Sequence, residues 1–306
     1  MTVPARLTRS LLFVPASRPA MIAKAALSAA DAVCLDLEDS VIDAEKPLAR
    51  AEAVRAFNEL DFGRRLRLVR INGLDTPFAY RDLVDVVEGA GTRIDLVMVP
   101  KAGSPADLAF VDTLLTQIEG LSGVTRRIGI EAQIESARGY LYAREIAAAS
   151  SRLEALIFGP GDFAASMQMP AAAIGERDEN DELYPGHRWH AVMQTVVAAA
   201  RANGLRCIDG PYAGYKDAAG LEHSCRVARA LGYDGKQCIH PAQLAIVNAV
   251  FSPSDSEVAR SSAIVAAYEA AVSAGQGAAS HEGRMIDAAS LRMARTTVER
   301  RRLIES

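Results

Sequence analysis

The stretch Ile128-Gly-Ile-Glu-Ala-Gln-Ile-Glu135 is a short, mostly apolar run that ends on a carboxylate. A second run of this kind, Leu156-Ile-Phe-Gly-Pro-Gly-Asp162, also ends on an acid. Each run is followed by a segment that can start a helix. Active sites of parallel α/β proteins are built where the strands end at their C-terminal edge. Both carboxylates are therefore expected at one rim of the fold.

Runs of this type recur along the chain and predict eight strands: Leu11–Ala16, Ala32–Glu38, Leu66–Asn72, Asp95–Pro100, Arg127–Glu135, Ala155–Asp162, Cys207–Ala213 and Gly235–His240. Most are almost continuously apolar, which is typical of strands that are covered on both faces. Ala-rich stretches with helical spacing lie between them, such as Met21–Ala30, Ala49–Asn58, Ala106–Glu119, Ala137–Ala149, Trp189–Asn203 and Asp217–Leu231. Eight strand–helix units in about 250 residues favour an α/β fold of the (β/α)₈ TIM-barrel type over an open sheet.

The pattern changes after the eighth unit. Ser254–Ser273 is predicted to form one more helix, Ala274–Gly283 a flexible Gly-rich linker, and Ser290–Glu299 a last helix. We therefore expect a catalytic barrel over residues 1–252 and a C-terminal helix, hinge and lid segment over residues 253–306. A Gly-rich hinge beside a barrel is one way to build a lid. The pattern is equally compatible with a surface-docked tail that has no catalytic role.

Composition narrows the class of protein. The chain has 306 residues and a formal net charge of −4, with no basic block of the kind that binds nucleic acid. No apolar run approaches the roughly 20 residues of a membrane helix. The four cysteines show no Cys-x-x-Cys spacing, so we expect reduced thiols and a cytoplasmic protein.

The two strand-end carboxylates, Glu135 and Asp162, have no Cys or His in the same turns. Such a pair suits a hard divalent cation such as Mg²⁺, with Mn²⁺ as a substitute. The competing interpretation is that both residues are helix N-caps, because acidic groups are favourable at helix N-termini. The two residues taken alone do not decide between these interpretations.

Other charged residues follow the predicted strands. Arg70 stands inside an apolar run, where a charge needs a partner, so a functional role is favoured. Glu38 and Asp39 are interpreted either as helix caps or as neighbours of a metal site. Lys101 is more readily explained as a solvated loop cation, and His240, which precedes Pro241, as a structural histidine.

Seven segments then match a known family in the same order: Arg9-Ser-Leu-Leu-Phe-Val-Pro-Ala-Ser-Arg-Pro19, Asp36-Leu-Glu-Asp-Ser40, Val69-Arg-Ile-Asn72, Val99-Pro-Lys101, Ile134-Glu-Ser-Ala-Arg-Gly139, Phe158-Gly-Pro-Gly-Asp-Phe163 and Gly235-Lys-Gln-Cys-Ile-His-Pro-Ala-Gln243. The chain resembles the citrate lyase β-subunit-like and malyl-CoA lyase proteins of the aldolase/citrate lyase superfamily. The fold of that family is a (β/α)₈ barrel. The resemblance implies a Mg²⁺-dependent carbon–carbon lyase that cleaves a β-hydroxyacyl-CoA such as malyl-CoA or citramalyl-CoA, or forms it by Claisen-type condensation. The products of cleavage would be an acetyl-CoA-type thioester and a 2-keto acid.

The resemblance also implies roles for residues in the barrel. Glu135 and Asp162 would hold the metal, and Glu135 would thereby also bind the substrate. Glu38 and Asp39 look like partners of metal-bound water. Arg70 is similar to the arginine that contacts thioester or keto-acid oxygens.

Further roles concern coenzyme A and the tail. Arg18, with Lys24 beside it, is similar to the residue that meets coenzyme A. Asp287, in Met285-Ile-Asp-Ala-Ala289, matches an acid that family members supply across a subunit boundary, although the proline of the family motif is absent. It is the candidate general base. A homotrimer or hexamer is therefore expected.

Two alternatives remain open at this point. The same site would suit a malyl-CoA thioester hydrolase, which releases free malate instead of a keto acid. The chain would also suit the β subunit of a multi-subunit citrate lyase that acts on an acyl-carrier thioester. The second alternative is less favoured, because the tail brings its own candidate catalytic acid.

Overall fold

The structure is a computed structural model that describes residues 4–184 and 188–306. Within these residues the chain forms two compact units. The first contains Thr8–Asn248 together with Pro4, and the second contains Ala249–Ser306 together with Ala5–Leu7. Each unit is described separately below.

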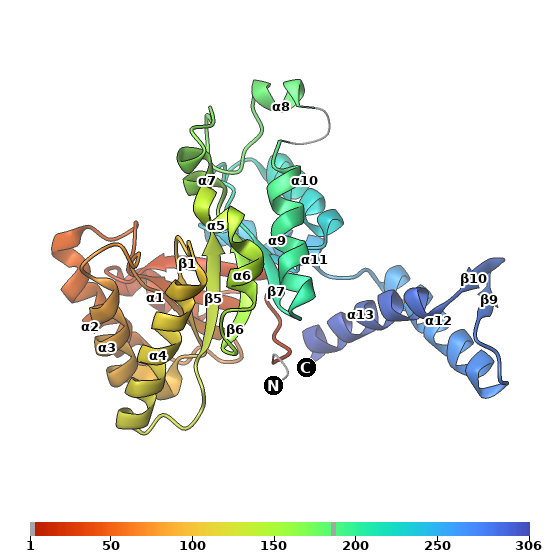
Figure 1. Ribbon diagram of the computed structural model, residues 1–306, viewed down its shortest axis with the longest axis horizontal. Helices are drawn as coiled ribbons and strands as arrows, with labels where there is room; N and C mark the ends of the chain where they lie inside the picture. The colour runs from red at the N-terminus through yellow and green to blue at the C-terminus, as the bar shows by residue number, and fades with distance from the viewer. Residues whose placement is uncertain (1–3, 185–187) are drawn as a thin grey trace. The chain divides into compact units, whose positions relative to one another are not determined.

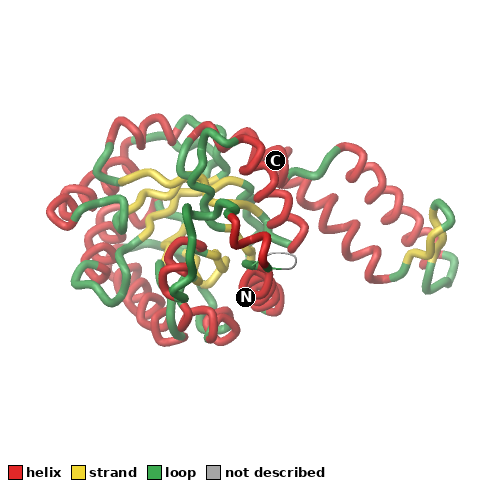
Figure 2. The backbone as a smooth tube through the Cα atoms, turned by 90° about the horizontal axis from the view of Figure 1, so that it is seen from above, coloured by secondary structure: helices red, strands yellow, loops and turns green. Residues whose placement is uncertain are grey.

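The first unit is a closed barrel of parallel strands in which each strand pairs with the next along the chain and β8 pairs with β1. The strands are β1 (Ser10–Pro15), β2 (Ala32–Asp36), β3 (Leu66–Arg70), β4 (Leu96–Val99), β5 (Gly129–Ile134), β6 (Leu153–Phe158), β7 (Arg206–Asp209) and β8 (Gly235–Cys238). Each of the eight apolar runs overlaps one of them, so the predicted (β/α)₈ barrel is confirmed. Figure 2 shows these strands in yellow within a surround of red helices.

Helices connect the strands as the barrel topology requires (Figure 1). They are α1 (Pro19–Ala26), α2 (Lys46–Glu59), α3 (Ala79–Ala90), α4 (Pro105–Ser122), α5 (Ala137–Leu141), α6 (Ala143–Ala147), α7 (Pro160–Ser166), α8 (Glu179–Leu183), α9 (His190–Ala202), α10 (Ala218–Leu231) and α11 (Leu244–Phe251), with short 3₁₀ turns η1 (Asp43–Glu45), η2 (Gly91–Arg93) and η3 (Pro241–Gln243). The single helix predicted over Ala137–Ala149 is instead two short helices, α5 and α6, which are separated at Tyr142.

The barrel core consists of fully buried side chains from facing strands. Its central cluster includes Leu11, Ala32, Cys34, Leu68, Leu96, Met98, Ile157 and Ile208. The cluster lies among the strands that end at the polar rim. Burial of this apolar surface fixes the strand ends, and therefore the side chains that follow them, in defined positions.

The second unit consists of α12 (Asp255–Ser273), α13 (Ala288–Glu305) and a hairpin of β9 (Ala279–His281) with β10 (Arg284–Ile286). The two helices agree with the predicted ones. The first half of the predicted Gly-rich linker has no helix or strand, whereas its second half forms β9 and the turn of the hairpin. The backbone turns at Glu282 and Gly283, which have φ values of 50° and 72°.

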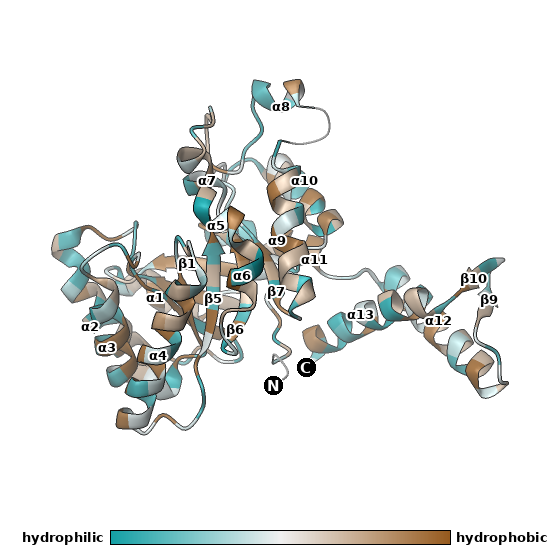
Figure 3. Cartoon of the chain, in the orientation of Figure 1, coloured by the Kyte–Doolittle hydropathy of each residue, from teal (hydrophilic) through white to brown (hydrophobic). Residues whose placement is uncertain are grey.

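Helix α13 combines charged and apolar side chains, and Figure 3 shows hydrophilic teal segments between hydrophobic brown ones along it. In the structure α13 packs against α12 and buries Leu291 and Ala294. An ion pair of 2.6 Å between Arg301 and Asp255 joins the same two helices. The tail therefore has a partner within its own unit.

The four cysteines, Cys34, Cys207, Cys225 and Cys238, are free and buried, as expected for reduced thiols. No helix among the described residues is long and apolar enough to cross a membrane.

Candidate active site

Charged side chains converge at the C-terminal edge of the barrel. Arg70 is the last residue of β3, and Glu135 directly follows β5. Lys101 follows β4, and Asp162 lies in the first turn of α7, just after β6. A cavity of about 310 Å³ opens between them, and its lining includes Arg70, Glu135 and Asp162 together with apolar side chains such as Phe13 and Ile174. The structure thus brings together the predicted metal ligands and the predicted substrate arginine.

Arg70 is held in place by two acids that follow or end β2. Its Nε and Nη2 donate to the two oxygens of Asp36 at 2.7 and 2.8 Å, and its Nη1 lies 2.8 Å from Glu38 Oε2. The guanidinium group also stacks over the ring of Phe13, 5.0 Å from its centroid. Burial alone would raise the pKa of Asp36, but Arg70 holds that pKa below its usual value. The pair is therefore charged, and the planar fork of Arg70 has one fixed orientation.

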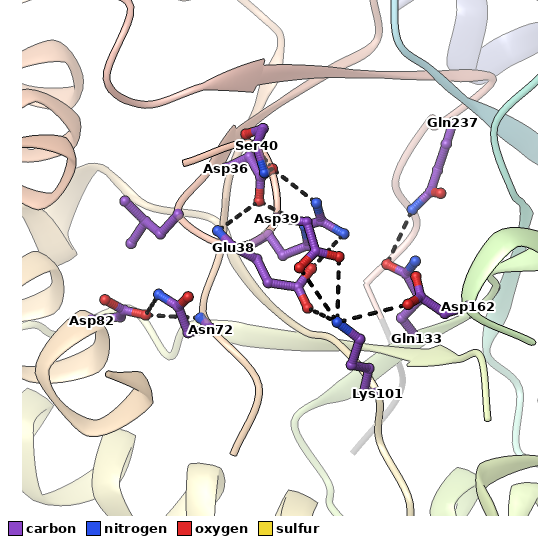
Figure 4. Close-up of polar contacts among 12 residues, drawn as sticks. Asp36, Glu38, Asp39, Ser40, Asn72, Asp82, Lys101, Gln133, Asp162 and Gln237 are labelled. Atoms are coloured by element: carbon purple, nitrogen blue, oxygen red, sulfur yellow. Dashed lines mark hydrogen bonds and ion pairs between the residues drawn. The ribbon is translucent and has the colours of Figure 1, made fainter. Parts of the chain in front are cut away.

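Lys101 joins acids from two sides of the cavity, as Figure 4 shows. Its Nζ donates to Glu38 Oε1 at 2.7 Å and lies 3.3 Å from Asp39 Oδ2 and 3.8 Å from Asp162 Oδ1. Although partial burial opposes it, the hydrogen bond to Glu38 raises the pKa of Lys101 above its usual range. The expectation of a solvated loop cation is therefore wrong.

Glu135 is almost completely buried, with 1% of its surface exposed. Oε1 accepts a hydrogen bond of 2.8 Å from the backbone N–H of Lys101, and Oε2 accepts one of 2.6 Å from the side chain of Gln133. Burial, followed by the nearby charges of Asp162 and Glu38, raises the pKa of Glu135 to about 8. The carboxylate thus stands in a region where negative charge is in excess.

The helix-cap interpretation is wrong for the strand-end acids. Ser136 caps α5 by accepting a hydrogen bond from the N–H of Gly139, and Gly159 holds the N-cap position of α7. The element after Glu38 and Asp39 is η1, whose N-cap is Ile42. These acids are therefore available for other contacts.

Gly159 leaves the space that the Glu135 carboxylate occupies. A Cβ atom at this position would overlap Glu135 Oε2 and lie 2.6 Å from Glu135 Cβ. No side chain larger than a hydrogen atom fits there without moving Glu135. The Gly-Pro-Gly-Asp segment therefore serves both predicted ligands, because it makes room for one and carries the other.

The residues present fit a hard divalent cation. Within the cavity lining, Glu135 and Asp162 offer only oxygen donors. Burial, and after it the charges of Asp162 and Glu38, raises the pKa of Glu135, and a bound cation would favour its charged form. Among residues 4–184 and 188–306, no three His, Cys, Asp or Glu side chains are grouped as a complete metal site. Mg²⁺ usually retains several waters and needs only one or two protein carboxylates.

The predicted coenzyme A residues make no ion pair with the acids of this cluster. Arg18, at the start of α1, is about half exposed and makes an ion pair of 3.3 Å with Glu45. Lys24 is exposed in the last turn of α1. Neither is paired with the acids around Lys101. His240 accepts a hydrogen bond from the N–H of Ala242 and caps η3, as expected for a structural histidine.

Asp287 belongs to the second unit. It is the N-cap of α13, where its Oδ1 accepts hydrogen bonds of 2.8 and 2.9 Å from the N–H and hydroxyl of Ser290. These bonds lower the pKa of Asp287 below its usual value. In this conformation the Asp287 side chain is exposed, so burial does not strengthen it as a base.

Sequence reasoning missed several residues of the site. No role was assigned to Asp36, which orients Arg70, although it lies in the Asp-Leu-Glu-Asp-Ser segment. Gln133 and Gln237 were also missed; Gln237 Nε2 donates to Gln133 Oε1 at 3.3 Å, so that Gln133 can present its own amide to Glu135. Both glutamines are polar residues inside strands, and that was the signal that could have found them.

Comparison with known proteins agrees with this geometry. The family model described as HpcH/HpaI aldolase/citrate lyase matches residues 9–241. The chain belongs to this HpcH/HpaI aldolase/citrate lyase family.

Particular relatives are similar over nearly the whole chain. An L-malyl-CoA/beta-methylmalyl-CoA lyase from Cereibacter sphaeroides is 46% identical, covering 99% of this chain and 97% of the relative. A (3S)-malyl-CoA thioesterase from the same species is 37% identical over 95% of this chain and 93% of the relative. The crystal structure of CitE from Mycobacterium tuberculosis in complex with magnesium, acetoacetate and coenzyme A has a TM-score of 0.75 and 33% identity, covering 97% of this chain and 98% of that one.

Proposed function

We propose that this protein is a Mg²⁺-dependent carbon–carbon lyase that cleaves a β-hydroxyacyl-CoA, of the malyl-CoA type, into an acetyl-CoA-type thioester and a 2-keto acid. The observation that carries the proposal is the cluster at the barrel rim. There, two carboxylates that suit a metal ion, Glu135 and Asp162, share one cavity with a rigidly held arginine, Arg70. The malyl-CoA lyase relative at 46% identity supports the reaction class.

Glu135 and Asp162 would hold the metal ion. When bound, Mg²⁺ supplies a Lewis acid that can polarise the carbonyl oxygen of the keto acid and orient its carboxylate. The neighbouring structure of CitE with magnesium, acetoacetate and coenzyme A supports this choice of cofactor. Mn²⁺ has similar oxygen preferences and is a suitable substitute.

Arg70 would stabilise the negative charge that develops on the thioester enolate oxygen. Its guanidinium group has five N–H donors on three nitrogens. The contacts to Asp36 and Glu38 involve each nitrogen once, which leaves two N–H donors for the substrate. A donor that is already oriented needs no reorganisation when charge develops in the transition state. Glu38 and Asp39 would hold the ammonium group of Lys101 in place near Asp162.

In the condensation direction, the α-carbon of the acetyl thioester must lose a proton to a general base. We assign this step to Asp287, brought from a neighbouring subunit, on the strength of the sequence resemblance. For this the side chain must leave its cap contacts with Ser290, because those contacts stabilise the carboxylate and weaken it as a base. Arg18 and Lys24 are the proposed contacts of the coenzyme A phosphates, as charge complementarity requires.

Thioester hydrolysis remains the competing reaction, because a malyl-CoA thioesterase is also a relative, at 37% identity. The two reactions differ in their products. A lyase releases acetyl-CoA and glyoxylate from malyl-CoA, whereas a hydrolase releases malate and free coenzyme A. Quantifying both pairs from one incubation with Mg²⁺ decides between them. Activity on the free CoA thioester by the chain alone also distinguishes the lyase from an acyl-carrier-dependent β subunit.

We also propose a homotrimer or hexamer that works in the cytoplasm. The tail acid at Asp287 supports shared sites, since the resembling family supplies it across a subunit boundary. Four buried, unpaired thiols support a reducing compartment.

A further inference from the structure

Lys101 is the cation that links the two sides of the cavity. Its Nζ contacts Glu38 and Asp39 after β2 and approaches Asp162 to 3.8 Å. Across residues 4–184 and 188–306, no other cation lies within ion-pair distance of Asp162. About a third of the Lys101 side chain is exposed.

The backbone of Lys101 is committed to the other ligand. Its φ of 50° lies in the left-handed region, which non-glycine residues rarely adopt and which persists where the surroundings fix it. In this conformation the N–H points at Glu135 Oε1, 2.8 Å away. One residue therefore contacts both candidate metal ligands, Glu135 through its backbone and Asp162 through its ammonium group.

We propose that Lys101 is the positioning residue of the metal site: its ammonium group takes the place of the divalent cation beside Asp162 when no metal is bound, and it gives up Asp162 when the metal binds. This inference rests on the Mg²⁺ site of the proposed function. The excess of acids over cations around the cavity provides the reason. Without a cation beside Asp162, Arg70 would be left to offset its repulsion of Glu135.

The role has a consequence with a definite sign. A single and a double positive charge about 6 Å apart repel enough, even in a water-like dielectric, to change a binding constant about tenfold. Removing the charge of Lys101 should therefore tighten metal binding. It should also lower turnover, because Asp39 loses its ion pair with Lys101 and Glu38 is left with its ion pair to Arg70. A purely structural role predicts the opposite for the metal, because a disordered site binds it more weakly.

Two charge-removing variants test this. Lys101→Asn suits the left-handed backbone, since Asn tolerates positive φ, and Lys101→Met keeps the length of the side chain. In calorimetry, we expect Mn²⁺ to bind about tenfold more tightly to either charge-removing variant than to the wild type. Turnover of malyl-CoA by these two variants should fall. Lys101→Arg keeps the charge and should bind Mn²⁺ as the wild type does. Lys216→Met, at an exposed lysine of the β7–α10 loop, is the matched control and should change neither quantity.

Equal or weaker Mn²⁺ binding by a folded Lys101→Asn or Lys101→Met protein overturns the role of Lys101. Failure of the wild type to bind Mn²⁺ would instead reject the metal site itself, and with it the proposed function.

A measurement on the wild-type protein decides the matter even if neither variant folds. Lysines are acetylated briefly with an amine reagent and mapped by peptide mass spectrometry, with Mg²⁺ or with EDTA. Because the metal takes over Asp162, Lys101 should be labelled several-fold faster with Mg²⁺, while Lys216 should be labelled equally in both. Equal labelling of Lys101 in the two conditions would contradict the exchange of partners.

Discussion

The guanidinium group of Arg70 is the most constrained charged group of the site. Two hydrogen bonds to Asp36 and one ion pair to Glu38 fix its plane, and the ring of Phe13 covers one face. A lysine at this position would keep the charge but lose the fork. This difference separates a catalytic role from a merely charged one.

We expect Arg70→Lys to fold and to lose turnover by roughly 10²–10³-fold, the usual cost of removing an oriented donor to a developing oxyanion. Steady-state kinetics with malyl-CoA, together with a thermal melt, measures both effects. Turnover within about threefold of the wild type would assign Arg70 to stability alone.

Glu135 makes metal binding depend on pH. Its pKa of about 8 in the metal-free protein means that it is mostly protonated at pH 6 and 7, and a ligand must lose its proton before it binds a cation. As the pH increases towards 8, the affinity for Mg²⁺ should rise about tenfold per pH unit, and above pH 8 it should level off. Calorimetric titrations between pH 6 and 9 measure this slope, and an affinity that is flat over this range would contradict it.

The same group sets a sign for stability. Because the folded protein holds the Glu135 proton more tightly than the unfolded chain does, the metal-free protein should lose stability as pH rises from about 4.5 towards about 8. Glu135→Gln, which cannot ionise, should lack this part of the pH dependence. It should also lose Mg²⁺ binding and at least about a hundredfold in activity, since even partners of metal ligands cost 10–100-fold.

Single residues were predictable from the sequence only where they stood at a strand end. Glu135, Asp162 and Arg70 were singled out because a charge closed or interrupted an apolar run, and the structure brings all three to one cavity. Lys101 was misjudged, since its role depends on acids that are distant in the sequence and on a left-handed backbone that no composition signal reports. Asp36 was given no role because its partner Arg70 comes from the next strand.

At the scale of elements, the turn from β6 to α7 connects local geometry with the site. Gly159 has φ and ψ of −107° and 95°, which any residue can adopt, so an added side chain would act through its contact with Glu135 and not through backbone strain. The predicted effect of substitution is therefore specific to the metal site.

We expect Gly159→Ala to weaken Mn²⁺ binding by at least about tenfold, because the added Cβ would displace Glu135, a proposed metal ligand. Mutating a residue that only contacts a metal ligand already lowers metal affinity by about tenfold or more. Calorimetry measures the binding and a thermal melt the stability. The control is Gly120→Ala in α4, where a Cβ meets open space and should stabilise the helix by about 0.5–1 kcal/mol without affecting the metal. Unchanged Mn²⁺ affinity in Gly159→Ala would show that Glu135 does not need this space.

Among the elements, the eight strands were predictable because short, continuous apolar runs that alternate with helical patterns are typical of buried parallel strands. The hairpin of β9 and β10 was not. Its strands have three residues each, too short for alternation to show, and the turn at Glu282 and Gly283 lacks the Asn-Gly or Asp-Gly signal of a two-residue hairpin. The break at Tyr142 between α5 and α6 likewise has no Gly or Pro to mark it.

At the scale of the whole molecule, the second unit carries Asp287, the proposed general base. Asp287 caps α13, and α13 packs on α12, so the acid sits on an ordered element. The sequence resemblance assigns this acid to a neighbouring subunit's site. That assignment is a prediction about assembly as well as about chemistry.

Asp287→Ala should lower turnover by roughly 10²–10⁴-fold, as loss of a general base does, with a smaller effect on coenzyme A affinity. Subunits carrying Asp287→Ala and subunits carrying Glu135→Gln, mixed under conditions that exchange subunits, should recover part of the activity. Mass spectrometry verifies that mixed oligomers form. Verified mixed oligomers that recover no activity would contradict a shared site. A protein that sediments as a monomer and is fully active would contradict it as well.

The reaction itself is the central claim, and one product analysis tests it most directly. The purified wild-type protein is incubated with malyl-CoA, with Mg²⁺ or with EDTA, and acetyl-CoA, glyoxylate, malate and free coenzyme A are quantified together. We predict equal amounts of acetyl-CoA and glyoxylate that form only when Mg²⁺ is present. Malate and free coenzyme A as the main products, or equal cleavage in EDTA, would contradict the assignment as a metal-dependent carbon–carbon lyase.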